Sequence, residues 1–222
     1  MDIAPLHFWQ VSPEEAIAIQ KRLREKILLK RKSKKLERIA AADVTYRESI
    51  ATAGVVVFSY PELKILEEGL ARVEVKFPYI PGLLSFREGP CIIKALEKIK
   101  EDIDLLLFDG QGIAHPRRMG IATHLGIYLN IPSVGCAKSK LVGKNAPLAN
   151  REGANEPLYD GGEMIGYVVR CKKNAKPIFV SPGNLIDFET TLKVVLSLCR
   201  GHRVPEPLRL AHIFVNKNKK GG

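Results

Sequence analysis

The sequence feature that most constrains the fold is a short apolar run, DLLLFDG at residues 104–110, which ends in Asp-Gly. Its apolar residues are consecutive rather than alternating, which is typical of a strand buried on both faces. A similar run, IPSVGCAKS at 131–139, follows a helical stretch at about 116–130. Strands of this kind need helices on both sides of their sheet. The two runs therefore predict an α/β protein.

Other extended runs indicate that the sheet is mixed. The runs at 38–46, 51–60 and 64–77 are joined by short links, which suit antiparallel hairpins. A further hairpin is expected from EMIGYVVRC and KPIFVSPGN. The segment before it, 141–162, is rich in Gly, Asn and Pro and is predicted to be a loop.

Local signals also predict the helices. Ser12 is a good N-cap and Pro13 suits a first turn, so a helix is expected over 12–30. Three more helices are expected, at 86–100, 187–200 and 206–218.

Length and composition fit one domain. The chain has 222 residues, so we expect a single domain over 1–222, with a basic N-terminal helical segment and a short basic C-terminal tail. No run of about 18 apolar residues is present, and the N-terminus MDIAPLHFWQ does not resemble a signal peptide. The four cysteines are far apart and form no CxxC pair, which argues against a zinc ribbon and suits reduced thiols. We therefore expect a cytoplasmic protein.

The formal net charge is +11, and it is concentrated in two places. Residues 21–38 hold ten basic and two acidic side chains, and Lys217, Lys219 and Lys220 carry the rest of the excess. Such patches favour a polyanionic partner, because Lys and Arg displace counterions from phosphates. A solvated helix face with a basic tail explains the charge equally well, and a surface for acidic lipid is a weaker alternative.

Three acidic residues stand where a carboxylate is costly or well placed for chemistry. Asp43 interrupts the apolar run AAADVTY, Asp109 ends LLLFDG, and Glu88 follows a Pro- and Gly-rich loop near the start of a helix. Together they would form an all-oxygen site that favours Mg²⁺ or Mn²⁺ over zinc. Taken singly, each has an ordinary explanation: a core hydrogen bonder, a turn residue and a helix-start charge.

Other polar residues lie near these acids in sequence. The segment GQGIAHPRRMG at 110–120 precedes a helix, and its backbone amides are candidates for binding phosphate or for close approach to a base. Lys138 follows an apolar strand, where it suits contact with a phosphate oxygen. His212 lies in a predicted helix, and on its own such a histidine is more often structural than catalytic.

Five blocks of the sequence resemble the endonuclease V family: KFPYIPGLLSFREGP, FDGQGIAHPRRMGIATHLG, VGCAKSKL, PIFVSPGN and PEPLRLAH. The match runs roughly from residue 36 to 216. It implies a ribonuclease H-like fold, with a mixed five-stranded sheet in which the first and fourth strands are neighbours and helices flank the sheet. That arrangement would bring Asp43 and Asp109 together.

The resemblance also implies roles for individual residues. Asp43, Glu88 and Asp109 would bind the metal, His212 would be a further catalytic residue, and Lys138 would contact phosphate. The residues near a pocket for a flipped hypoxanthine base would be Gly82, Leu84, Gly110 and Gln111.

Tyr79 would be a wedge that enters the duplex beside the lesion. It lies in the PYIP loop, which Pro78 and Pro81 make irregular and stiff. The alternative is that Tyr79 packs under the loop as part of a small satellite core.

The function implied by the resemblance is a Mg²⁺-dependent endonuclease specific for deoxyinosine in DNA, with Mn²⁺ as a substitute metal. It would hydrolyse the second phosphodiester bond 3′ to the lesion as a monomer, without a membrane partner. One alternative is an enzyme of the same fold that cuts inosine-containing RNA. Another is a non-catalytic nucleic-acid-binding protein, against which the acids argue, because carboxylates repel phosphate unless a metal intervenes.

Overall fold

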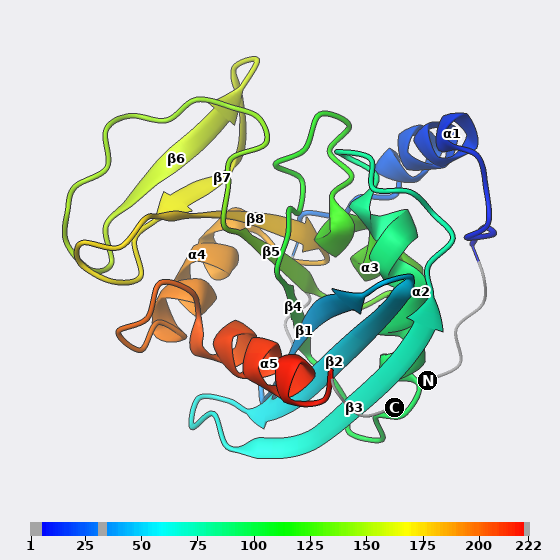
Figure 1. The fold of residues 1–222 in the computed structure, drawn as a ribbon. Coiled ribbons are helices and arrows are strands. Elements are labelled where there is room, and N and C mark those ends of the chain that lie inside the picture. Colours follow the sequence, from blue (N-terminus) through cyan, green and yellow to red (C-terminus); the bar gives the residue numbers. More distant parts are fainter. Residues whose placement is uncertain (1–5, 31–34, 220–222) are drawn as a thin grey trace.

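The described residues, 6–30 and 35–219 of the computed structural model, form one eight-stranded sheet with helices on both faces (Figure 1). The strands are β1 Arg38–Arg47, β2 Ile50–Ser59, β3 Ile65–Glu74, β4 Leu105–Phe108, β5 Ser133–Ala137, β6 Asn155–Asp160, β7 Glu163–Val169 and β8 Ile178–Asn184. The helices are α1 Pro13–Arg24, α2 Leu84–Leu96, α3 Ile121–Leu129, α4 Phe188–Ser197 and α5 Glu206–Lys217.

Five neighbouring strands, in the order β3-β2-β1-β4-β5, form the sheet that the resemblance implies. β2 is antiparallel to β1 and β3, whereas β1, β4 and β5 are parallel. The first and fourth strands are neighbours, so the predicted ribonuclease H-like fold is confirmed. The sheet then continues beyond five strands, because β8, β7 and β6 add to β5 in antiparallel pairs.

The side chains of β1 show why the sheet needs two layers of helices. Ala40 and Ala42 belong to the core formed with α2 and α3, while Ile39 and Ala41 belong to the core formed with α4 and α5. Figure 1 shows these helix pairs on opposite faces of the sheet. All four residues of β4 are buried, as the unbroken apolar run predicts.

Two predicted element boundaries were wrong. The helix expected over 12–30 ends at Arg24, and the chain beyond it is tied to the end of β8, because Leu28 exchanges hydrogen bonds with Asn184 and Leu185. The loop expected over 141–162 contains β6, in which Leu158 alone is fully buried. A strand that buries so little has no alternating apolar pattern to reveal it.

The charged segment 21–38 is accordingly not one continuous helix. Its first basic residues lie in the last turn of α1, where cations favour the negative end of the helix dipole. Residues 31–34 and Lys220 lie outside the described part of the chain. Among the described residues, no helix has the length and apolar character needed to cross a membrane.

Candidate active site

The three predicted metal-binding acids lie on one small cavity. Asp43 is in β1, Asp109 directly follows β4, and Glu88 is in α2. The parallel pairing of β1 and β4 places Ala42 opposite Phe108. The residues that follow them, Asp43 and Asp109, therefore lie side by side. Asp43, Glu88 and Asp109 together line a cavity of about 180 Å³. The sheet topology therefore explains how residues far apart in sequence meet.

Burial and mutual repulsion dominate the electrostatics of this cavity. Burial, together with the charges of Asp43 and Asp109, raises the pKa of the Glu88 carboxyl to about 8. Burial also raises the pKa of Asp43, to which the charge of Asp109 adds, while His212 acts in the opposite direction. Neighbouring ionised carboxylates repel one another, so a positive charge between them stabilises their ionised forms.

Each acid has a partner that supplies a hydrogen bond or a positive charge. The pairs are Lys138 Nζ with Asp109 Oδ2, His212 Nδ1 with Asp43 Oδ2 at 2.8 Å, and Tyr46 Oη with Glu88 Oε1 at 3.1 Å. Both Lys138 and His212, which the resemblance implies as functional, thus flank the acidic cavity.

The donor set fits a hard divalent cation, although the side chains do not enclose one. In the part of the chain that the structure describes, no three His, Cys, Asp or Glu side chains converge enough to hold a metal ion. The carboxylates instead point to Lys138, His212 and Tyr46. Oxygen-only donors that share a cavity and repel one another nevertheless have the chemistry that Mg²⁺ and Mn²⁺ prefer.

A glycine explains how His212 reaches Asp43. Gly54 of β2 is paired with Asp43 of β1. A Cβ added to Gly54 would lie 2.8 Å from Phe214 Cδ1 and 3.2 Å from Val215 Cβ. Only glycine therefore allows α5 to pack this closely on the sheet and to bring His212 over the acid.

The contacts of His212 define its tautomer. The ionised carboxylate of Asp43 only accepts hydrogen bonds, so Nδ1 of His212 carries the hydrogen. Nε2 then has the lone pair, and Asn216 Nδ2, which donates to His212 O at 2.8 Å, lies near both ring nitrogens. His212 is half-exposed, and its Nε2 is suited to accept a proton.

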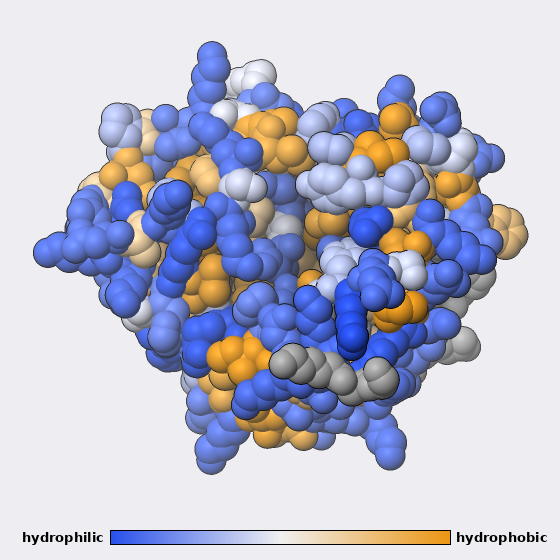
Figure 2. All heavy atoms as spheres, viewed as in Figure 1, coloured by the Kyte–Doolittle hydropathy of each residue, from blue (hydrophilic) through white to orange (hydrophobic). Residues whose placement is uncertain are grey.

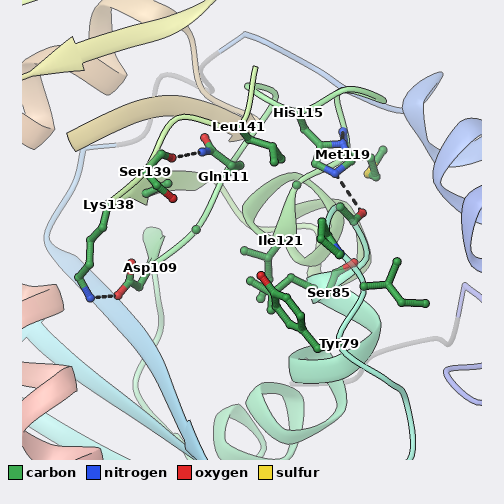
Figure 3. A pocket seen from close by; sticks show the side chains of 17 residues that line it. Tyr79, Ser85, Asp109, Gln111, His115, Met119, Ile121, Lys138, Ser139 and Leu141 are labelled. Carbon is green, nitrogen blue, oxygen red and sulfur yellow. Dashed lines mark hydrogen bonds and ion pairs between the residues drawn. The ribbon is translucent and has the colours of Figure 1, made fainter. Parts of the chain in front are cut away.

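A second cavity, of about 260 Å³, adjoins the first and contains the predicted base pocket (Figure 3). Its lining includes Tyr79, Gly82, Leu84, Gly110 and Gln111, together with Asp109 and Lys138. Asp109 and Ile121 line both cavities. In the space-filling view, a hollow near the middle of this face is bordered by apolar and polar surface (Figure 2).

Tyr79 does not pack under its loop. Its side chain is 69% exposed at the edge of the second cavity. The small core beneath the loop is formed by Phe77, Leu83 and Phe86, with Ile80 packed against it. The satellite-core alternative is therefore wrong for Tyr79.

Gln111 carries an unused acceptor in the pocket wall. Its Nε2 donates to the carbonyl oxygen of Ser139 at 2.9 Å, which fixes the orientation of the amide (Figure 3). Its Oε1 is buried and has no hydrogen-bond partner among the described residues. A buried acceptor of this kind favours a ligand that brings a donor.

The three glycines of the segment 110–120 do not offer free backbone amides for phosphate. The amides of Gly110, Gly112 and Gly120 donate to Phe108 O, Ser181 Oγ and Gly112 O within the protein. The charged side chain of Arg118 pairs with Asp160 and Glu163. Close approach remains the use of these glycines: a Cβ on Gly110 would lie 2.6 Å from Ile121 Cγ2.

Three residues that support the site were not predicted from the sequence. Tyr46 donates to Glu88, and Arg87 lies over the Tyr46 ring with its Cζ 4.7 Å from the centroid while donating to Phe77 O. Gln20 is fully buried in α1, on the same helix face as Ala16 and Leu23. A glutamine at an apolar helix position is the signal that points to it.

The fold and the two cavities define a class of protein. It is the class of ribonuclease H-like α/β proteins with an acidic site where the first and fourth strands of the sheet lie side by side. The sequence profile described as Endonuclease V matches residues 21–213. Endonuclease V of Methanothrix thermoacetophila is 47% identical over 215 residues, covering 97% of this chain and 96% of that protein.

Solved structures agree. The crystal structure of Endonuclease V from Streptomyces avermitilis has a TM-score of 0.89 and 34% identity, covering 96% of this chain and 95% of that one. Ciona intestinalis Endonuclease V, solved with a 23mer DNA containing an inosine followed by a ribo-adenosine, has a TM-score of 0.82 and 28% identity, covering 95% and 99%. The chain belongs to the endonuclease V family.

Proposed function

We propose that this protein is a Mg²⁺-dependent endonuclease that recognises deoxyinosine and hydrolyses the second phosphodiester bond 3′ to it. The observation that carries the proposal is the shared wall of the two cavities, since Asp109 lines both the acidic cavity and the base pocket. The cleavage position, and the 3′-hydroxyl and 5′-phosphate ends, follow from the family resemblance. Mn²⁺ would substitute for Mg²⁺.

The chain's own residues supply the remaining chemistry. A divalent ion bound by Asp43, Glu88 and Asp109 would activate water and offset the charge on the phosphate. Lys138, which pairs with Asp109, is the side chain suited to donate to a phosphate oxygen. His212 orients Asp43 through Nδ1 and would accept a proton from the attacking water at Nε2.

Selection of hypoxanthine over adenine follows from the acceptor of Gln111. Hypoxanthine carries a hydrogen on N1, whereas N1 of adenine is an acceptor. Facing N1, the unpartnered Oε1 of Gln111 would therefore accept from hypoxanthine and would meet a second acceptor in adenine. Leaving a buried acceptor unpaired costs about 1–3 kcal/mol, which is about 5–150-fold in affinity.

Inosine-containing RNA is the second candidate substrate. The observation that favours it is the ribo-adenosine beside the inosine in the DNA bound to the Ciona intestinalis protein. Contacts to the 2′-hydroxyl distinguish the two polymers.

One nicking assay tests the proposal and its alternative. The substrates are matched duplexes with and without inosine, as DNA, as RNA and with one ribonucleotide 3′ to inosine, each with Mg²⁺ or with chelator. Mg²⁺-dependent nicking of inosine DNA alone supports the proposal, and faster cutting of the ribonucleotide substrates supports the alternative. No inosine-dependent cutting of any substrate would overturn both.

A further inference from the structure

One carbonyl oxygen at the edge of the base pocket accepts three side-chain hydrogen bonds. The oxygen belongs to Gly82, which ends the PYIP loop and has a φ of 83°. Its donors are Gln20 Nε2 at 2.9 Å, His115 Nε2 at 3.0 Å and Arg117 Nη2 at 2.9 Å. Figure 3 shows His115 beside the pocket, with a dashed line for its hydrogen bond.

The contacts of His115 show that it is a neutral donor. The backbone amides of Arg117 and Met119 both point to its Nδ1, at 3.1 and 3.3 Å, so Nδ1 is the acceptor and Nε2 carries the hydrogen. Burial, together with the charge of the nearby Arg117, lowers the pKa of His115 to about 4. His115 therefore holds Gly82 at neutral pH without a charge of its own.

Gln20 connects this carbonyl to a second segment of the pocket wall. Its Nε2 also donates to Met119 O at 3.1 Å, and its Oε1 accepts from Arg117 Nε at 2.6 Å. Gly82 and Met119 both line the pocket, yet they come from different loops. The Gln20 side chain is fully buried and reaches both from α1, which itself contributes no residue to the pocket.

We infer that Gln20 is a positioning residue for lesion specificity, which fixes the spacing between the PYIP loop and the 110–120 loop. The inference rests on the proposed function, because it assigns Gln20 to the pocket for hypoxanthine. Apolar contacts of Ile80 and Leu83 anchor this loop, and the hydrogen bonds to Gly82 O restrain it further. α1, outside the five diagnostic blocks, is thereby part of the selective machinery.

Two substitutions separate the hydrogen bonds of Gln20 from its volume. Gln20→Met keeps an unbranched side chain of similar length but removes every hydrogen bond. Gln20→Glu keeps an acceptor for Arg117 and loses the N–H groups that hold Gly82 and Met119. The matched control is Val194→Ala, which removes a buried apolar contact in the core on the other face of the sheet and touches neither carbonyl.

The first measurement is the Kd for an inosine duplex and for the same duplex with adenine in its place, in chelator. The preference for inosine is the Kd of the adenine duplex divided by the Kd of the inosine duplex. We expect this ratio to fall at least tenfold in both Gln20 variants. Binding of the adenine duplex, and the affinity of the free protein for Mn²⁺, should change less than twofold. Val194→Ala should keep the ratio even where its Tm falls as far as that of Gln20→Met.

The second measurement is hydrogen exchange of residues 80–84 and 115–119 in the free protein, which needs no substrate. We expect at least tenfold faster exchange in both Gln20 variants and no such change in the central strands. If the wild-type protein shows no preference for inosine, the proposed function is refuted. The exchange result then still decides whether Gln20 fixes the spacing of the two loops. Unchanged exchange in these segments would overturn the role of Gln20. So would an unchanged Kd ratio in the Gln20 variants, provided that the wild-type protein prefers inosine.

Discussion

Removing the charge of Glu88 should stabilise the metal-free protein while it abolishes nicking. Burial, with the charges of Asp43 and Asp109, raises the pKa of this carboxyl from 4.5 to about 8. A folded-state pKa above the unfolded value gives stability that is complete below 4.5 and is lost as the pH rises towards 8. Each pH unit in this window withdraws about 1.4 kcal/mol, so wild type loses about 3 kcal/mol between pH 5 and pH 7 through this group.

Glu88→Gln removes this loss without removing the hydrogen bond, because its amide oxygen still accepts from Tyr46. In chelator, the variant should therefore be about as stable as wild type near pH 5 and about 3 kcal/mol more stable at pH 7. Urea unfolding across this pH range measures the difference. Saturating Mn²⁺ should reduce it, because a bound cation stabilises the ionised carboxylate of wild type.

The control is Glu97→Gln, which removes an acidic charge from an exposed position directly after the same helix. It should leave the pH dependence of stability unchanged. If Glu88→Gln gains no stability at pH 7, or gains as much at pH 5, the electrostatic account of the acidic cavity is wrong.

Four further results are expected. Asp109→Ala should abolish nicking with the fold retained, checked by single-turnover cleavage and circular dichroism; full activity would refute the metal-site assignment. Tyr79→Ala should keep the wild-type Tm, because the side chain is exposed, but weaken inosine-duplex binding by about 1–3 kcal/mol with partial recovery at a mismatch; early melting would argue against the wedge. Gly54→Val should destabilise by about 1–3 kcal/mol and slow nicking, because its side chain would displace α5 and His212; normal cleavage at reduced Tm would separate packing from catalysis. Neutralising the basic residues of 30–35 should weaken binding of all duplexes alike and flatten its salt dependence; an unchanged salt slope would leave this segment as a solvated surface.

The sequence predicts well those features that burial imposes on a continuous segment. β4 is buried on both faces, so its apolar run is unbroken, and the acid that ends it is conspicuous. β6 lies at the sheet edge with most of its side chains partly exposed, so its pattern resembles a loop. The predicted end of α1 is wrong for a different reason, since Leu28 donates to Asn184 Oδ1 and accepts from the Leu185 amide, and these contacts hold residue 28 outside the helix.

The same distinction separates the site residues that were predicted from those that were not. Asp43 and Asp109 stand out because charged residues in apolar strands are costly. Tyr46 and Gln20 act through partners 42 and 62 residues away in sequence, Glu88 and Gly82. Such roles depend on which elements the fold brings together, and local residue patterns do not contain that information.

The position of Asp109 explains how one short loop would serve both recognition and chemistry under the proposed function. Asp109 ends β4, and Gly110 and Gln111 follow it directly into the wall of the base pocket. Gly110 packs against Ile121, which lines both cavities, and leaves little space for this turn to move independently of α3. A base that contacts Gln111 therefore acts on a backbone whose position also determines that of Asp109. Binding of the base could therefore influence the metal site directly, because the residue that would bind the metal and the residue that would bind the lesion are two positions apart.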